Sequence, residues 1–337
     1  MNLVAIKKLV KYFSVSPRSW NPFQKDVVHA VDGVDFEIQR GETLGLVGES
    51  GCGKTTLGRC LLRLIEPTSG QILFESQDIT PLSKRKMRQL RKDMQIIFQD
   101  PFSSLDPRMK VGELIAQPFD VFGVPGKENK RDRLAFLLES VGLEPDSMSR
   151  FPHEFSGGQR QRIAIARALA LNPKFVVADE PVSALDVSIR AQILNLMNQL
   201  KKRFQLTYLY ISHDLSTIQF ISDRIAVMYL GKVVETGSVK TIFKNPKHPY
   251  TKILLDAVPI PNPLHRKRRK PMIGEPPSPI SPPQGCRFHP RCPQKMEVCR
   301  QIEPETVQIQ SEHRVACHLY AHGDGALCPW DLGMKEN

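Results

Sequence analysis

The chain has 337 residues, 41% of them hydrophobic, so it is long enough for one large domain with an appendage or for two domains. No run approaches 18 consecutive apolar residues, and lysines interrupt the N-terminal residues too often for a signal peptide, so we expect a cytosolic chain without a membrane span. The net charge of +12 favours anionic partners such as nucleotides, nucleic acids or lipid headgroups.

Alternating strand and helix patterns fill the N-terminal part of the chain and predict an α/β fold. The first residues alternate like a strand, and the continuous apolar runs at 43–48 and 174–179 are typical of strands buried on both faces. Amphipathic helix patterns cover 82–93 and 127–141, and the sequence from about 100 to 170 is largely helical. We therefore predict a mainly parallel sheet with a helical subdomain inserted in it.

The segment GESGCGKTT, residues 48 to 56, lies between an apolar run and a helix pattern. Its glycines let backbone amides point inward around phosphate oxygens, and the helix that follows presents its positive N-terminus to the same anion. Lys54 is expected to reach the β- and γ-phosphates, and Thr55 to offer a hydroxyl to Mg²⁺. The residues predicted to contact the nucleotide here are Gly48, Glu49, Ser50, Gly51, Cys52, Gly53, Lys54, Thr55 and Thr56.

Two acids, Asp179 and Glu180, end the second apolar run. A carboxylate in this position can hold Mg²⁺ through water, and the next carboxylate can polarise an attacking water. We expect Asp179 to contribute to nucleotide and Mg²⁺ binding, and Glu180 to act as the general base or to orient the water. Together with the phosphate segment, the pair predicts a nucleotide hydrolase.

A second helix that is built to meet an anion begins at Ser156, Gly157, Gly158 and Gln159. Ser156 is placed as an N-cap, and the two glycines leave backbone amides uncovered. The helical subdomain separates this helix from Lys54, so one nucleotide is not expected to touch both within one chain. We predict that two chains face each other head to tail, and that each completes the other's site.

With these motifs in order, the chain resembles the ATP-binding cassette (ABC) transporter family, which has a P-loop NTPase fold. The run SGGQ at 156–159 is similar to the family signature, although Phe155 replaces the usual leucine. The resemblance identifies Gln99 as the glutamine that senses Mg²⁺, His213 as the switch histidine at the γ-phosphate, and 183–186 as a loop across the dimer interface.

The resemblance also implies a mechanism in which two ATP molecules join two ABC domains and hydrolysis releases them. Lys54, Glu180 and His213 would be the catalytic residues. Thr55, Gln99 and Asp179 would hold Mg²⁺. Tyr12 would stack on adenine, with Phe13 as the alternative.

The C-terminal part of the sequence resembles one particular group within this family. Residues 245–259 and 274–293 are similar to the extension of ATP-binding subunits from bacterial oligopeptide and dipeptide importers, which related nickel importers share. This implies a peripheral ATPase at the cytoplasmic face of the bacterial inner membrane, powering uptake of di- or oligopeptides. Implied partners are a paralogous ATP-binding subunit in a heterodimer, two integral-membrane permease subunits and an extracytoplasmic peptide-binding protein, without nucleic acid. The transported solute and the identity of the second ABC subunit stay open.

Four cysteines, Cys286, Cys292, Cys299 and Cys317, lie close together near the C-terminus. In a reducing compartment such spacing favours a metal over disulfides, and four thiolates suit Zn²⁺ or a [4Fe–4S] cluster. Because the set resembles the tail cysteines of peptide-importer ATPases, we expect a [4Fe–4S] cluster, with Zn²⁺ as the alternative. Zinc could also use the nearby histidines His289, His313 and His318.

Composition divides the chain into an ATPase domain at 1–258, a proline-rich basic linker at 259–285 and a cysteine-rich extension at 286–325. The basic run at 265–270 is interpreted as solvated rather than as a nucleic-acid site. The alternative function is a soluble ATPase of the same family that acts on nucleic acid or ribosomes and carries a zinc-binding tail.

Overall fold

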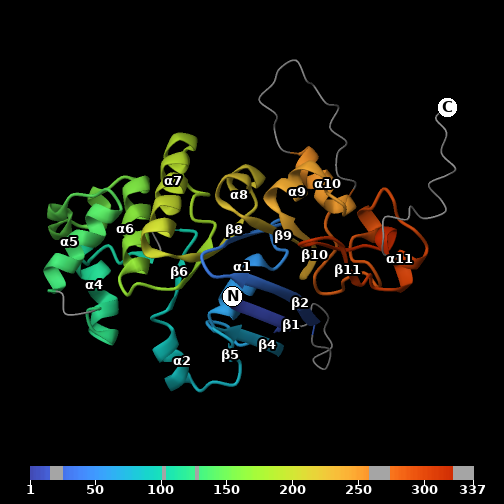
Figure 1. The fold of residues 1–337 in the computed structure, drawn as a ribbon, viewed down its shortest axis with the longest axis horizontal. Helices are drawn as coiled ribbons and strands as arrows, with labels where there is room; N and C mark the ends of the chain where they lie inside the picture. Colours follow the sequence, from blue (N-terminus) through green and yellow to red (C-terminus); the bar gives the residue numbers. More distant parts are fainter. Residues whose placement is uncertain (16–25, 101–103, 126–128, 258–273, 322–337) are drawn as a thin grey trace, which may run out of the picture.

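A computed structural model describes residues 1–15, 26–100, 104–125, 129–257 and 274–321 of the chain (Figure 1). The described residues form two sheets with helices around them. The larger sheet has eight strands in the order β11-β12-β10-β9-β3-β8-β7-β6, and the smaller has four in the order β2-β1-β4-β5.

The larger sheet consists of β3 (Thr43–Val47), β6 (Met94–Ile97), β7 (Phe175–Asp179), β8 (Thr207–Ser212), β9 (Arg224–Tyr229), β10 (Lys232–Ser238), β11 (Thr306–Gln310) and β12 (His313–Ala316). The smaller consists of β1 (Asn2–Val15), β2 (Asp26–Gln39), β4 (Ser69–Phe74) and β5 (Gln77–Asp78). The α-helices are α1 (Lys54–Leu61), α2 (Lys84–Leu90), α4 (Val111–Phe122), α5 (Lys130–Ser140), α6 (Gly157–Leu169), α7 (Val187–Phe204), α8 (Leu215–Ile221), α9 (Val239–Lys244), α10 (Pro249–Asp256) and α11 (Val298–Gln301). Short 3₁₀ helices are η1 (Pro145–Ser149), η2 (Pro152–Glu154), η3 (His289–Arg291) and η4 (His318–Tyr320).

Five neighbouring strands of the larger sheet, β9, β3, β8, β7 and β6, run parallel, as predicted. Strand β7 shows why its sequence is uniformly apolar. Phe175 and Val177 belong to one core cluster, whereas Val176 and Ala178 belong to the other. Since alternate residues of a strand point to opposite faces, both faces of this strand are covered. The carboxyl ends of all five strands therefore lie at one edge of the sheet.

The predicted helical segment between β6 and β7 contains α4, α5 and α6. Figure 1 shows these helices at one end of the long axis and the tail, with β11 and α11, at the other. The patterns at 82–93 and 127–141 contain α2 and α5, so both helix predictions are confirmed. The sequence analysis did not predict the smaller antiparallel sheet.

The tail joins the larger sheet instead of forming a detached appendage. Strand β12 pairs antiparallel with β10, so that Glu235 lies opposite Val315. The Nε2 atom of His313 lies 2.8 Å from Oε1 of Glu235, and both side chains are almost completely buried. Glu235 also accepts hydrogen bonds from the backbone N–H groups of Lys247 and His248. A buried polar cluster therefore fixes the tail to the sheet.

Within the described ranges, no helix combines the length and apolarity needed to cross a membrane.

Candidate functional site

The loop between β3 and α1 curls around the side chain of Lys54. Lys54 is only 5% exposed, and its Nζ donates to the carbonyl oxygens of Gly48 and Glu49, each at 2.8 Å. Gly53 has φ +107°, and a Cβ atom there would lie 1.9 Å from the carbonyl oxygen of Ala30. Only glycine fits this position, so the loop sequence is dictated by the curl that brings the backbone amides inward.

Thr55 and Asp179 meet beside this loop. The hydroxyl of Thr55 donates to Oδ1 of Asp179 at 2.9 Å. Burial raises the pKa of Asp179 above its usual range, although the hydrogen bond from Thr55 opposes the shift. A cation at this point would stabilise the buried carboxylate, and a hydroxyl beside a carboxylate is a donor set that Mg²⁺ accepts when phosphates and waters complete its shell. These two residues therefore fit the predicted Mg²⁺ site.

Glu180 is held by two other predicted residues. Nε2 of Gln99 donates to Oε2 of Glu180 at 3.0 Å, and Nδ1 of His213 lies 3.0 Å from Oε1. The backbone of Glu180 has φ +48°, a left-handed conformation that is uncommon outside glycine and often occurs at functional sites. The structure thus brings together the ends of β6, β7 and β8 and fixes both carboxylate oxygens.

An open cavity of about 530 Å³ lies between the loop and these side chains. It is lined by Phe13, Val28, Ala30, Ser50, Gly51, Gly53, Lys54, Thr55, Thr56, Gln99, Glu180, His213 and Pro279. Most of the side chains predicted to act on a nucleotide phosphate therefore face one cavity.

The two aromatic candidates for adenine stacking point in different directions. Phe13 lines the cavity, whereas the hydroxyl of Tyr12 donates to Oδ1 of Asp32 at 2.8 Å. The Tyr12 ring packs on His29, with ring centroids 4.3 Å apart. Burial and the bond to Asp32 raise the pKa of Tyr12 to about 12. The structure therefore favours Phe13, the alternative, over Tyr12.

Comparison with known proteins identifies the family. A family model described as "ABC transporter" matches residues 31–183, and one described as "Oligopeptide/dipeptide transporter, C-terminal region" matches residues 234–299. The oligopeptide transport ATP-binding protein AppF of Bacillus subtilis (strain 168) is 51% identical over 324 residues, which cover 95% of this chain and 98% of that protein. The chain belongs to the ABC transporter family.

Other relatives agree with this assignment. The putative peptide import ATP-binding protein BOV_A0347 of Brucella ovis is 48% identical over 315 residues, covering 94% of this chain and 97% of that protein. The solved dimeric structure of the ATP-binding cassette MJ0796 bound to ADP and Pi is 28% identical, with a TM-score of 0.61, and covers 70% of this chain and 98% of that one. The cbiO1 structure from Clostridium perfringens is also 28% identical, with a TM-score of 0.62, and the match covers 72% of this chain and 91% of that one. The predicted P-loop NTPase fold is confirmed, and the chain is an ATPase of this family.

The predicted signature segment, residues 156–159, lies apart from the phosphate loop of the same chain. Ser156 caps α6: its Oγ accepts from the N–H of Gln159 at 3.3 Å, and the Gln159 side chain accepts from the N–H of Ser156 at 3.0 Å. Ser156 is exposed, and among the described residues that line the 530 Å³ cavity none belongs to 156–159. The chain's own loop and signature thus do not meet.

The four tail cysteines are free thiols, buried at Cys299 and Cys317 and half-buried at Cys286 and Cys292. Burial raises the pKa of Cys286 to about 11 and that of Cys317 to about 12, and the charges of the other tail thiols contribute to both shifts. Within the described residues, however, no group of three or more His, Cys, Asp or Glu side chains is arranged to hold a metal ion.

The histidines suggested as zinc ligands have other partners. His289 Nδ1 lies 2.9 Å from the carbonyl oxygen of Cys286, and His318 Nε2 lies 2.8 Å from that of Ile302. His313 contacts Glu235, as described above. The geometry therefore gives no support to a zinc site that includes these histidines.

Sequence reasoning missed the environment of Glu49. Its carboxylate does not line the cavity but contacts Arg291 of the tail, at 2.8 and 3.0 Å. The two residues are 242 positions apart, so no local pattern could have indicated the contact.

Proposed function

We propose that the chain is the ATP-hydrolysing subunit of a membrane importer and powers uptake of di- or oligopeptides. The observation that carries the catalytic part is the arrangement of Glu180 between Gln99 and His213 at the cavity of the phosphate loop. The transport part is supported by relatives at about half identity that are named oligopeptide transport and peptide import ATP-binding proteins.

In the proposed reaction, the loop amides and Lys54 bind the β- and γ-phosphates, and Phe13 packs on the adenine. Thr55, Asp179 and Gln99 would hold Mg²⁺, which offsets phosphate charge. Glu180 takes a proton from water as the water oxygen bonds to the γ-phosphorus. The bond from that phosphorus to the bridging oxygen breaks, and ADP leaves with the electron pair. His213 holds the Glu180 carboxylate and reaches the γ-phosphate.

We propose that a second ABC subunit completes each site with its signature helix. The separation of Ser156 from the cavity supports this arrangement, as does Val187, a hydrophobic residue that follows the 183–186 loop and is 79% exposed. The N-terminus of α6 would meet the γ-phosphate bound by the other subunit. ATP then joins the two subunits, and hydrolysis separates them. We propose a paralogue as the second subunit.

The remaining proposed partners are two integral-membrane permease subunits and an extracytoplasmic peptide-binding protein, which place the chain at the cytoplasmic face of the plasma membrane. The comparisons give no support to the alternative of an ATPase that acts on nucleic acid or ribosomes. The basic run at 265–270 lies outside the described residues.

Transport measurements test the proposal. Cells that lack the chain are complemented with the wild type, Lys54→Ala or the control Lys92→Ala, and uptake of a labelled dipeptide, a tetrapeptide and Ni²⁺ is measured. The proposal expects peptide uptake with the wild type and the control only. Uptake of Ni²⁺ alone, or of peptides with Lys54→Ala, contradicts it.

We also propose that Cys286, Cys292, Cys299 and Cys317 ligate a [4Fe–4S] cluster, with Zn²⁺ as the alternative. The proposal rests on the spacing of the four cysteines in the sequence and on their being free thiols, and a cluster would cross-link the tail segments that carry them. Anaerobically purified protein should contain iron and sulfide that Cys292→Ser removes and Cys328→Ser, outside the described residues, retains. Stoichiometric zinc without iron would exclude the cluster.

We keep the division into 1–258, 259–285 and 286–325 as a proposal about the sequence segments. The two family matches support an ATPase segment followed by a distinct C-terminal region. Because β12 pairs with β10, we propose that the extension is packed as part of the ATPase rather than as an independently folded domain.

A further inference from the structure

The short segment between Cys286 and Cys292 brings an arginine to the phosphate loop. The side chain of Arg291, in η3, is 5% exposed and donates from both terminal nitrogens to the two oxygens of Glu49, at 2.8 and 3.0 Å. It also donates to the hydroxyl of Tyr229 at 3.4 Å. Burial opposes the charge of Arg291, but the bonds to Glu49 and Tyr229 outweigh it and raise its pKa.

Glu49 links this arginine to the residue that binds phosphate. Its carbonyl oxygen accepts from Nζ of Lys54 at 2.8 Å, and its N–H donates to the hydroxyl of Tyr250 at 3.0 Å. The backbone of Glu49 is therefore part of the curl around Lys54, while its side chain is held by the tail. Without Arg291, a carboxylate on the residue that holds Lys54 would be left uncompensated, and the loop would lose the contact that fixes it to the tail.

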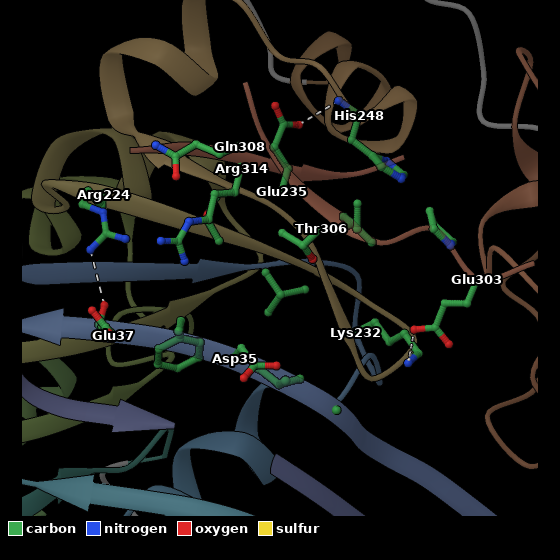
Figure 2. A pocket seen from close by; sticks show the side chains of 18 of the residues that line it. Asp35, Glu37, Arg224, Lys232, Glu235, His248, Glu303, Thr306, Gln308 and Arg314 are labelled. Carbon is green, nitrogen blue, oxygen red and sulfur yellow. Dashed lines mark hydrogen bonds and ion pairs between the residues drawn. The ribbon is translucent and has the colours of Figure 1, made fainter. Parts of the chain in front are cut away.

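Further contacts fasten the same tail segment to this side of the site. Arg287 donates to the carbonyl oxygen of Leu230 and to Asp32. Gly231, next to Leu230, donates to the carbonyl oxygen of Cys52 in the phosphate loop at 2.9 Å. Figure 2 shows the neighbouring cavity of about 630 Å³, where Lys232 of β10 lies 2.5 Å from Glu303 of the tail. The tail is thus anchored on both sides of Arg291.

We propose that Arg291 is a positioning residue for ATP binding. It holds the carboxylate of Glu49, keeps the phosphate loop in its curved conformation and compensates a negative charge that the loop carries. The inference rests on the proposed ATP site. It differs from a purely structural role, in which Arg291 would stabilise the tail without affecting the affinity for ATP.

Equilibrium binding of Mg·ATP to the purified full-length chain distinguishes the two roles. Arg291→Gln should weaken binding roughly tenfold, because a bidentate charged contact is lost and Glu49 is left unpaired. The matched control is Arg300→Gln, since Arg300 is 55% exposed and pairs with Glu297 inside the tail. This control should bind ATP within about twofold of the wild type.

A double-mutant cycle shows whether the effect passes through Glu49. In the Glu49→Gln background, Arg291→Gln should weaken binding less than about threefold further, because the charge that it compensates is gone. Arg291→Lys, which keeps the charge but loses the bidentate contact, should give an intermediate affinity and provides the readout if Arg291→Gln does not fold.

Two results would overturn the inference: affinities of the Arg291 variants equal to that of the control, or the same loss in both Glu49 backgrounds. Lys54→Ala must abolish binding in the same assay. If the wild type fails to bind, or Lys54→Ala binds equally well, the proposed ATP site is wrong and this inference falls with it. If Lys54→Ala behaves as expected and Arg291→Gln binds like the wild type, only the role of Arg291 is wrong.

Discussion

The helical end and the tail end of the molecule lie at opposite ends of its long axis, with α1 and the phosphate loop between them (Figure 1). At the helical end, Ser156 is exposed and the signature helix does not reach the cavity of its own chain. At the tail end, Arg291 is buried and contacts Glu49 of the loop.

This difference indicates how the ATP site is assembled. At the tail end, the contact of Arg291 with Glu49 is already buried within the single chain. The tail side of the phosphate loop is therefore positioned before another subunit binds. The uncovered helix N-terminus at the helical end is instead suited to a phosphate held by another subunit. We infer that the tail sets affinity for ATP and that the signature helix sets hydrolysis.

The largest expected effect concerns Glu180, which should matter only after the helical end has engaged a second subunit. Glu180→Gln keeps the size of the side chain but cannot accept a proton, so ATP turnover should fall roughly a hundredfold or more. Binding of ATP should persist, and size-exclusion chromatography with ATP should show a lasting dimer. Turnover at the wild-type rate would exclude Glu180 as the base.

The free energy of unfolding should depend on pH because of His248, a buried residue at the start of α10. Burial lowers the pKa of His248 from 6.5 to about 4, so the folded chain keeps it neutral while the unfolded chain protonates it near 6.5. The stability that depends on neutral His248 is complete above pH 6.5 and is lost as the pH falls towards 4. Between pH 7 and pH 5 the loss should be about 2 kcal/mol in the free energy of unfolding.

His248→Asn is the matched variant for that measurement. Asparagine can still accept the N–H of Tyr250, which the Nδ1 of His248 accepts at 3.1 Å, but it does not titrate. Burial also opposes the charge of Glu235, but hydrogen bonds from His313 and nearby backbone outweigh it and lower its pKa, so the stability that it contributes is lost only below about pH 4.5, outside this window. Denaturant titrations should show a clearly smaller loss for the variant, and an unchanged loss would contradict the role of His248.

A smaller effect should separate the two aromatic residues of β1, one facing the ATP cavity and one facing the tail side. Phe13→Ala should weaken ATP binding roughly tenfold, because a stacking surface is lost. Tyr12→Phe keeps the ring and loses only the bond to Asp32, so its affinity should stay within about twofold. Binding of a fluorescent ATP analogue measures both, and the opposite order would restore Tyr12 as the stacking residue.

Lys54 and the pair Asp179 and Glu180 could be predicted from the residues, because each follows a continuous apolar run, whereas Gln99 and His213 were predicted only from the resemblance to the ABC transporter family. Lys54, Gln99, Glu180 and His213 each follow a short apolar strand, so their meeting is a consequence of topology. Tyr12 and Phe13 could not be ranked, since neighbouring residues on a strand face opposite ways and the register comes from pairing with β2. The contact between Arg291 and Glu49 could not be predicted, because the two residues are 242 positions apart and meet only in the folded chain.

The central claim is that this chain positions its phosphate loop by itself but needs a second subunit's signature helix for hydrolysis. The most direct test is ATP turnover per chain as the concentration of ABC subunits, its own or a paralogue's, is raised. Ser156→Arg is compared with Ser83→Arg, which alters the exposed N-cap of α2. We predict turnover that rises with concentration and falls at least tenfold with Ser156→Arg only. Full turnover by a dilute monomer, unaffected by Ser156→Arg, would contradict the account.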